Sequence, residues 1–438
     1  MHRIINSRSY FQKAAVVASL LTLLALSACG QSTEQTAETA TEPADAAPST
    51  VVLYEGARII VGDGSDPIQN GAFTVDGGQF VAIGAAGDVS APDGATRVDL
   101  SGKTVMPTIV DAHTHLSVTR EELLDDLQRR ALFGVSATLS MGADGPGAPL
   151  EMRDEVIPGA ALYRSAGHGI TAPELGRREV HWVTNEEEAR EAVRTEIARN
   201  VDVIKLWVDD RDGQYDKLSP EIYSAAIDEA HQNNVRVSAH LFDLADAKGL
   251  VLAGVDIFAH GVRDMDVDEE FVEMVKARPN LVLIPNLRAR GVATDLDWLT
   301  GLISDQMLVD LQGNNVKNPE IQEAYNIQAR NLARLNNEDM TITVGTDGNR
   351  PWGPHVEMED MVASGMTPAQ VLVAATRNGA ALLELGDTGT IEADKNADFI
   401  VLNANPLDDI TNTRQISSVF LRGEEVDRAE ISARWLGM

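Results

Sequence analysis

Eight short apolar runs between residues 105 and 385 alternate with helix-sized segments, and this alternation is the feature that most constrains the fold. The runs end near residues 115, 141, 167, 208, 240, 260, 287 and 347. Segments with a helical pattern, such as 186–199 and 220–233, lie between them. Eight strand-then-helix units predict an α/β fold in which a parallel sheet closes into a (β/α)8 TIM barrel. Residues 297–337 have a helical pattern twice over, so an extra helical excursion is expected after the seventh strand.

Both ends of the folded region have the pattern of a small sheet domain. From residue 51 on, short β-prone runs are broken by Gly and Asp-Gly turns, which is the pattern of β-hairpins. Residues 397–410 and 417–427 have the same character, so we expect the two chain ends to join in one domain. The predicted boundaries are 51–106 with 389–438 for the composite sheet domain and 107–388 for the barrel.

The N-terminal segment has the pattern of an export signal followed by a tether. Residues 1–28 combine three cations and no acidic residue with an apolar run of about 15 residues, too short to span a bilayer. The sequence Leu-Ser-Ala-Cys, which ends at Cys29, resembles the lipobox of bacterial lipoproteins. We therefore expect 1–28 to be a signal peptide and Cys29 to carry lipid. Residues 29–50 lack aromatic and large aliphatic side chains and are predicted to be a disordered tether.

The predicted location is the cell envelope, with the lipid anchor as the only membrane contact and the domain facing the periplasm or the exterior. Gly30, rather than Asp, follows the cysteine, which favours the outer membrane. The alternative is an ordinary cleaved signal, or an uncleaved anchor, with an incidental cysteine. Because Cys29 is the only cysteine, the folded domain is expected to be stable without disulfides.

The charge balance excludes one class of partner. The chain has 67 acidic and 36 basic residues, which gives a net charge of −31. Binding to nucleic acid requires a basic face that neutralises phosphates. We therefore expect no nucleic-acid partner.

Polar residues that can bind a metal lie at the C-terminal ends of five apolar runs, the end at which TIM barrels build active sites. They are His113 and His115 in the first run, Lys205 in the fourth, His240 in the fifth, His260 in the sixth and Asp347 in the eighth. Residues two apart in a strand share a face, so His113 and His115 can reach one ion. A single strand histidine is more often a hydrogen-bonded core residue, but four of the nine histidines fall at such ends. Imidazole and carboxylate ligands suit zinc or a similar divalent ion.

Lys205 lies within the apolar run VDVIKLWV, where an isolated ammonium group is costly to bury. One solution is a lowered pKa followed by reaction with CO2, because the resulting carbamate is a carboxylate-like metal ligand. The alternative is an ion pair with Asp347 or another acid at a strand end.

Five stretches together resemble the amidohydrolase superfamily, and are most similar to its imidazolonepropionase-like and prolidase-like members. They are SGKTVMPTIVDAHTHL, DVIKLWVD, VSAHLFDLADAKGLVLAGVDIFAHGV, TVGTDG and the segment from MTPAQVLVAATRNGAALLELGDTG to IEADKNADFIVLNANPL. They occur in the order of that family and cover essentially all of residues 51–438. The resemblance implies a barrel of roughly 280 residues with a small β-sandwich made from both chain ends.

The resemblance also implies a role for each residue at the strand ends. His113 and His115 would bind one divalent ion with Asp347, and His240 and His260 would bind a second, with zinc as the expected metal. Lys205, carboxylated by CO2, would bridge the two ions. A metal-bound hydroxide would attack the substrate, and Asp347 would accept its proton and pass it to the leaving nitrogen. The chain departs from the family at 207–211, where a small glycine-containing loop is common.

The substrate is predicted from residues next to these ligands. His168 lies in a Gly-His-Gly turn that partly matches a turn of the family, and Arg288, Arg290 and Arg350 follow predicted strand ends. A guanidinium at the barrel mouth could bind a substrate carboxylate in a bidentate manner, although surface arginines in loops are commoner. The expected small-molecule substrate is therefore a dipeptide or an N-acyl amino acid. Two alternatives are a hydrolase of cyclic amides or lactones, and a non-catalytic, lipid-anchored protein that binds a metal or a solute.

Overall fold

The computed structural model describes residues 49–437 apart from 178–179, 288, 293 and 314–316. The expected signal peptide, Cys29 and nearly all of the tether lie outside the described residues, and so does Arg288. Among the described residues, no helix combines the length and the apolar composition that crossing a bilayer requires.

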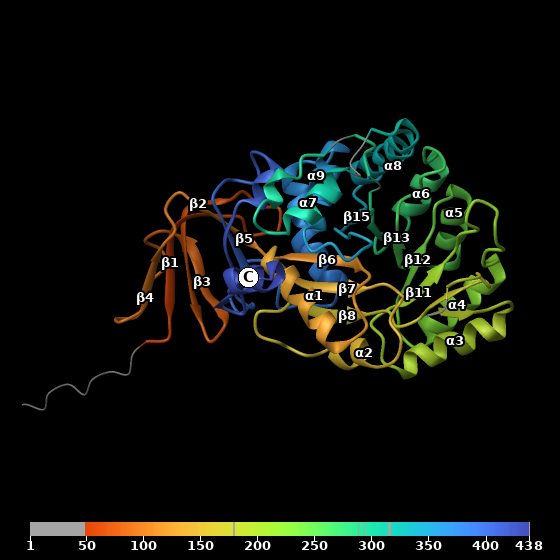
Figure 1. Ribbon diagram of the computed structural model, residues 1–438, viewed down its shortest axis with the longest axis horizontal. Coiled ribbons are helices and arrows are strands. Elements are labelled where there is room, and N and C mark those ends of the chain that lie inside the picture. The colour runs from red at the N-terminus through yellow and green to blue at the C-terminus, as the bar shows by residue number, and fades with distance from the viewer. Residues whose placement is uncertain (1–48, 178–179, 288, 293, 314–316, 438) are drawn as a thin grey trace, which may run out of the picture. The chain divides into compact units, whose positions relative to one another are not determined.

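The strands of the central region form two parallel sheets (Figure 1). The smaller sheet has the order β6 (Ile109–Thr114), β7 (Val135–Ser140) and β8 (Leu162–Ser165). The larger sheet has the order β10 (Val180–Trp182), β9 (Gly169–Thr171), β11 (Ile204–Trp207), β12 (Val237–His240), β13 (Ile257–Ala259), β14 (Val282–Ile284) and β15 (Thr341–Ile342). Eight of these strands correspond to the eight apolar runs, whereas the run pattern did not predict β9 and β10.

Backbone hydrogen bonds connect the two parallel sheets on both sides. The Ala112 N–H of β6 donates to the Val344 carbonyl just after β15 at 2.9 Å, and the Asp202 N–H before β11 donates to the Ser165 carbonyl of β8 at 2.9 Å. The predicted α/β fold of TIM-barrel type, with mostly parallel sheets, is thereby confirmed. In such a fold the C-terminal ends of the strands share one side, where the candidate site is built.

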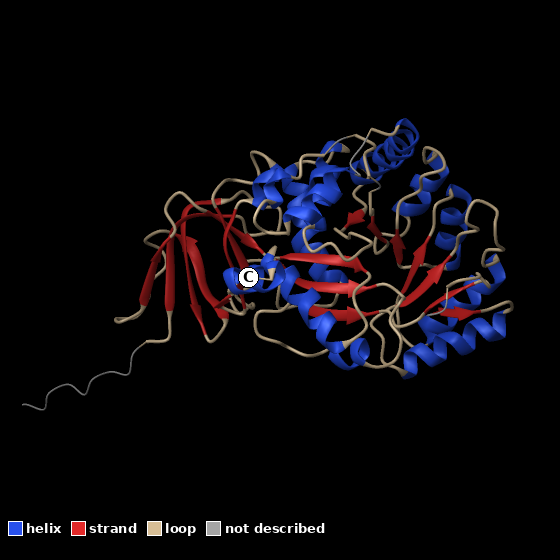
Figure 2. Cartoon of the chain, in the orientation of Figure 1, coloured by secondary structure: helices blue, strands red, loops and turns tan. Residues whose placement is uncertain are grey.

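Helices lie around the outside of these strands (Figure 2). Their bounds are α1 (Arg120–Leu132), α2 (Ala148–Met152), α3 (Glu186–Ala198), α4 (Pro220–Gln232), α5 (Leu244–Ala253), α6 (Glu269–Lys276), α7 (Asp305–Gly313), α8 (Pro319–Asn337), α9 (Gly353–Ala363), α10 (Pro368–Val373) and α11 (Gly379–Leu382). Short helical turns span Asp297–Leu299, Ala374–Asn378 and Ile410–Arg414. Helix α3 shows how the local sequence favours a helix. The Asn185 side chain caps its first turn, and Ala189, Ala192 and Val193 form its buried face. The helices α7 and α8 occupy the interval in which the sequence predicts an extra excursion.

The two ends of the described chain meet in one mixed sheet. Its order is β18 (Glu424–Glu425), β17 (Ile416–Leu421), β16 (Phe399–Leu402), β5 (Thr104–Pro107), β1 (Val52–Ile59), β2 (Ile68–Asp76) and β3 (Gln79–Ala85), and β4 (Thr96–Asp99) pairs with β1. The antiparallel pairing of β16 with β5 joins the C-terminal strands to the N-terminal ones, and helix α12 (Arg428–Leu436) ends the chain. Tyr54 stacks on Phe73 at 4.8 Å and Phe399 on Phe420 at 4.4 Å between ring centroids, which gives this sheet an aromatic core of its own. The β-sandwich and the domain boundaries remain predictions.

Candidate metal centre

Five of the six residues predicted as metal ligands lie near or beyond the C-terminal ends of the parallel strands, and the sixth, Lys205, is the second residue of its strand. His113 is in β6 and His115 follows it directly, Lys205 is in β11, and His240 ends β12. His260 follows β13 by one residue, and Asp347 lies in the turn after β15. These elements come from separate parts of the chain, and the parallel topology places their ends on one side.

Asp347 connects the histidines of two groups. One carboxylate oxygen, Oδ1, lies 3.2 Å from Nε2 of His113 and 3.0 Å from Nε2 of His115. The other oxygen, Oδ2, lies 3.6 Å from Nε2 of His260, whose ring centroid is 4.6 Å from that of His240. The ligand atoms of His113, His115 and Asp347 all lie within 4.8 Å of one another, which is compact enough for them to share one ion.

Two neighbouring side chains fix which nitrogen of each imidazole faces the centre. Nδ1 of His113 donates to Oδ1 of Asn286 at 2.9 Å, so its Nε2 carries the lone pair. Nε2 of His240 donates to Oδ2 of Asp209 at 3.3 Å, which leaves the lone pair on Nδ1. Burial lowers the pKa of His113 to about 4 and that of His240 to about 3, so both rings are neutral at pH 7. Such partners orient metal-binding histidines in known metal sites.

Asn286 and Asp209 are functional residues that the sequence argument missed. Asn286 lies two residues after the end of β14, and Asp209 lies two residues after the end of β11. The histidines were selected because they are metal-binding residues at the ends of apolar runs. The same search would have found Asn286 and Asp209 if it had included polar residues that can hydrogen-bond to a metal-binding histidine.

Lys205 is fully buried, with an exposed fraction of 0%, and its Nζ has no hydrogen-bond partner among the described residues. Burial lowers the pKa of its ammonium group to about 7, although the charge of Asp347 opposes this change. An ion pair with Asp347, the alternative that the sequence left open, is not formed between the described residues. The side chain is therefore a partly unprotonated amine beside a set of metal-binding groups.

The backbone around the centre is strained. His260, Asn286 and Asp347 have φ values of 129°, 44° and 52°, a region that residues other than glycine seldom adopt. Such strain costs on the order of 1–3 kcal/mol at each residue and clusters at functional sites. It persists because surrounding contacts hold it: the Asp347 N–H, for example, donates to the carbonyl of His113 at 2.8 Å.

A buried ion pair beneath the centre supports the turn that carries Asp347. The carboxylate of Asp111 and the guanidinium of Arg130, both 0% exposed, are 3.2 Å apart. Asp111 also accepts hydrogen bonds from the backbone and hydroxyl of Thr346 at 3.1 and 2.8 Å, and Arg130 donates to the Gly348 carbonyl at 3.1 Å. The residues on both sides of Asp347 are thus fastened to β6 and α1. Although burial raises the pKa of Asp111 to about 6, Arg130 opposes that rise.

His168, predicted to contact the substrate, lies in a separate cluster with His181 and Glu196. The buried Glu196 carboxylate accepts the His168 backbone N–H at 3.1 Å and the His181 ring N–H at 2.6 Å. It also pairs with Arg199 at 2.6 Å. Because a cation already occupies this carboxylate, we interpret the cluster as the support of the Gly-His-Gly turn.

The three arginines predicted to bind a substrate carboxylate have different environments. Arg290 forms ion pairs with Glu359, at 2.7 Å, and with Asp360, both on α9, so its guanidinium is already engaged. Arg350 is exposed in the turn after Asp347, and Arg288 is outside the described residues. The arginine whose charge acts on Lys205 is instead Arg177. It lies in a loop after β9, so the search for polar residues at the ends of apolar runs did not select it.

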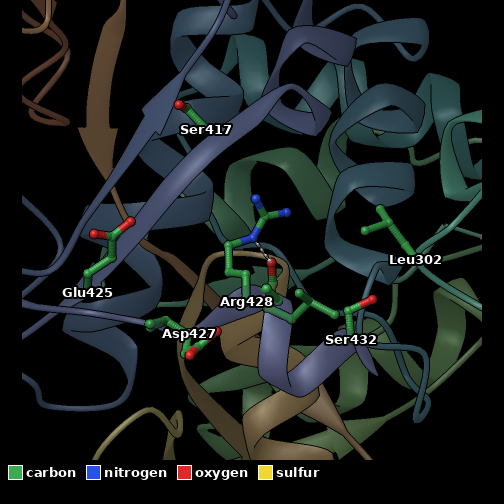
Figure 3. A pocket seen from close by; sticks show the side chains of 9 residues that line it. Leu302, Ser417, Glu425, Asp427, Arg428 and Ser432 are labelled. Carbon is green, nitrogen blue, oxygen red and sulfur yellow. Dashed lines mark hydrogen bonds between the residues drawn. The ribbon is translucent and has the colours of Figure 1, made fainter. Parts of the chain in front are cut away.

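A hollow of about 650 Å3 lies between α12 and the strands β17 and β18 (Figure 3). Arg428, which lines it, donates to the backbone carbonyls of Leu132 at 2.8 Å and Ile416 at 3.0 Å. None of the histidines of the metal centre lines this hollow. We therefore assign no function to it.

Several known proteins are similar to this chain in sequence and in fold. The model of the amidohydrolase family matches residues 104–426. Ochratoxinase from Aspergillus niger is 26% identical over 418 residues, which cover 82% of each chain. Imidazolonepropionase from Streptomyces avermitilis is 25% identical, over 77% of this chain and 81% of its own. The structure of a Bifidobacterium longum protein assigned as a prolidase superimposes with a TM-score of 0.71 and 27% identity, covering 87% of this chain and 97% of its own.

Proposed function

This chain belongs to the amidohydrolase family, and on that premise we propose that it cleaves the amide bond of a dipeptide or an N-acyl amino acid with the help of two zinc ions. The proposal does not concern the enzyme class, which the family already shows. The chain is an amidohydrolase whose homologues act on carbon–nitrogen bonds, as its sequence predicted. The substrate, the metal and the number of ions are the proposed elements.

The observation that carries the proposal is the composition of the centre. Four imidazoles and one carboxylate surround a buried lysine amine that has no hydrogen-bond partner among the described residues. A buried polar atom without a partner costs roughly 1–3 kcal/mol, so a ligand that satisfies this amine would stabilise the site. The family generally binds divalent metals, and the donor types here suit zinc. His113, His115 and Asp347 would hold one ion, and His240 and His260 would hold the other.

Lys205 would supply the group shared by both ions. Its unprotonated amine can attack the carbon of CO2, which forms an N–C bond, moves one C–O electron pair onto oxygen and releases a proton from nitrogen to water. The product is an anionic carbamate with two oxygen donors. The pKa of about 7 keeps a substantial fraction of the amine unprotonated and reactive at neutral pH.

When bound, divalent ions polarise a carbonyl group and lower the pKa of water. The side chains of this protein provide the remaining functions. Although burial favours the neutral acid, the hydrogen bond with Nε2 of His115 at 3.0 Å helps to keep the pKa of Asp347 below its ordinary value, so the carboxylate is ionised in the resting site. It can then accept a proton on the side facing His260 and deliver it to the leaving nitrogen. Asn286 and Asp209 keep His113 and His240 oriented meanwhile.

The test is a substrate panel on zinc-supplemented protein, together with elemental analysis. We expect about two ions per chain and hydrolysis of linear amides that carry a carboxylate. Turnover of cyclic amides or lactones alone would replace the proposed substrate class with the cyclic one. Metal binding without turnover of any substrate would favour a binding protein, and a stoichiometry that stays at one with Lys205 intact would refute the bridged pair.

Lys205→Ala separates the carbamate from a merely structural lysine. The variant should lose metal and nearly all activity, and added acetate or propionate should restore part of both by placing a carboxylate in the gap. Wild-type turnover in Lys205→Ala without any added acid would refute the bridging role.

A further inference from the structure

The indole ring of Trp207 forms a rigid wall beside the metal centre. Trp207 lies two residues after Lys205 on β11, so both side chains point to the same side of the strand. Its exposed fraction is 7%. Gly142 and Gly169 leave room for the ring: a Cβ at position 142 would lie 2.6 Å from Cη2 of the indole, and one at position 169 would lie 1.9 Å from Cζ3. The ring is therefore held against backbone and cannot shift toward either glycine.

Arg177 lies on this wall. The carbon of its guanidinium is 4.4 Å from the centroid of the Trp207 ring, within the range of a cation–π contact. On the opposite edge, Nε of Arg177 is 3.6 Å from Oε2 of Glu174, whose other oxygen accepts a hydrogen bond from Arg211 at 3.1 Å. The guanidinium is thus held by the Trp207 ring on one side and by Glu174, of its own loop, at Nε.

One nitrogen of this guanidinium makes no hydrogen bond within the part of the chain that the structure describes. Nη1 of Arg177 is buried and has no hydrogen-bond partner among the described residues, although the side chain as a whole is 26% exposed. A buried, charged donor without an acceptor is unfavourable unless a ligand supplies one. Arg290 also has a buried nitrogen, Nη2, without a hydrogen-bond partner among the described residues, but two carboxylates of α9 form ion pairs with its guanidinium.

Arg177 lies beside the metal centre. The centroid of the Trp207 ring, on which its guanidinium stacks, is 5.7 Å from Nζ of Lys205. An anion bound to this guanidinium would therefore lie close to Lys205.

We propose that Arg177, stacked on Trp207, binds the carboxylate of the substrate and thereby selects substrates that carry one next to the scissile amide. This inference rests on the proposed function and extends it to a specificity-determining residue. A guanidinium offers parallel N–H donors that match a carboxylate, and the rigid indole preorganises them. The stacking residue lies in the segment 207–211, in which this chain departs from the family pattern.

The test compares two series of substrates that differ only in this charge: N-acetyl-L-amino acids and the same compounds with a C-terminal carboxamide, with acetate release as the readout. Wild-type protein should prefer the acids. In Arg177→Met, kcat/KM for the acids should fall about 10- to 100-fold, mainly through KM, which is the loss expected for one charge-assisted pair. The amides should change less than about threefold, and Arg177→Lys should keep part of the preference.

Arg194→Met is the matched control, because it removes an exposed guanidinium from the outer helix α3 and should leave both series unchanged. Metal content and melting temperature would show that each variant is folded. If Arg177→Met keeps the wild-type preference for acids, the inference is wrong and the proposed function stands. If wild-type protein hydrolyses neither series, the proposed function fails. Calorimetric binding of the N-acetyl amino acids then decides the inference, and equal binding, or no binding, by wild type and Arg177→Met would overturn it.

Discussion

Replacing Lys205 with methionine should make the metal-free protein more stable while it abolishes function. The side chain is 0% exposed and its amine has no hydrogen-bond partner among the described residues, so in the absence of metal and CO2 the cost of burying its charge outweighs the attraction of Asp347. Methionine has a similar length and shape and no charge. The substitution therefore removes the unfavourable group without leaving a large cavity.

The size of the effect follows from the pKa. Burial lowers the pKa of Lys205 from its ordinary value of 10.5 to about 7 in the folded state. A difference of one in pKa corresponds to about 1.4 kcal/mol, so the charged lysine destabilises the fold by about 5 kcal/mol below pH 7 and by about 4 kcal/mol at pH 7. Between pH 7 and 10.5 the unfolded state binds the extra proton, so this penalty shrinks as the pH rises. Above pH 10.5 it is absent.

The assay is urea unfolding of chelator-treated protein in CO2-free buffer at several pH values between 6 and 10. Lys205→Met should exceed wild type in free energy of unfolding by about 4 kcal/mol at pH 7, and the difference should shrink toward higher pH. The control Lys276→Met changes an exposed lysine of α6, which pairs with Glu273, and should differ by less than about 1 kcal/mol at every pH. A Lys205→Met variant that is no more stable than wild type, or a difference independent of pH, would refute the reasoning about this lysine.

Three further predictions address proton transfer, ligand orientation and location. Asp347→Asn keeps the shape and one oxygen but not the basicity, so metal content should remain while kcat falls by on the order of 10²-fold or more; full activity in a steady-state assay would contradict the proton path. Asp209→Asn can no longer accept strongly from Nε2 of His240, so zinc affinity should fall roughly 10- to 100-fold in a chelator competition, and an unchanged affinity would show that this hydrogen bond does not orient the ligand. Cys29→Ala should block lipid attachment and maturation, whereas protein that begins at Val51 should keep its metal content and kcat; cell fractionation in which Cys29→Ala matures and anchors like wild type would overturn the lipoprotein hypothesis.

The strained turns at the centre explain why these side chains meet at all. His260, Asn286 and Asp347 have positive φ values and lie one, two and five residues beyond the ends of their strands. Each conformation redirects the chain where a strand ends. The cost of that strain is offset by the buried contacts of Asp111 and Arg130, which hold the last of these turns in place.

The sequence by itself determined the positions of eight of the ten strands in the parallel sheets, and the ends at which the polar residues gather. Apolar runs of strand length between helical segments are local patterns, and the parallel topology that follows from them places all C-terminal ends on one side. For this reason His113, Lys205, His240 and Asp347 could be predicted as neighbours although more than 230 residues separate the first from the last. No detail of any loop was needed for that inference.

Only the tertiary structure decided which partner each polar side chain has. Asn286 holds His113 across 173 residues of chain, Glu196 anchors the turn of His168, and α9 engages Arg290. Such pairings depend on the path of loops and on contacts between distant elements, and the period of a strand or helix carries no information about either. Arg177 shows this most clearly, because its loop has no periodic sequence pattern. Its proposed role depends on the stacking contact with Trp207, which lies 30 residues further along the chain, and on Gly142 and Gly169, which leave room for the indole ring.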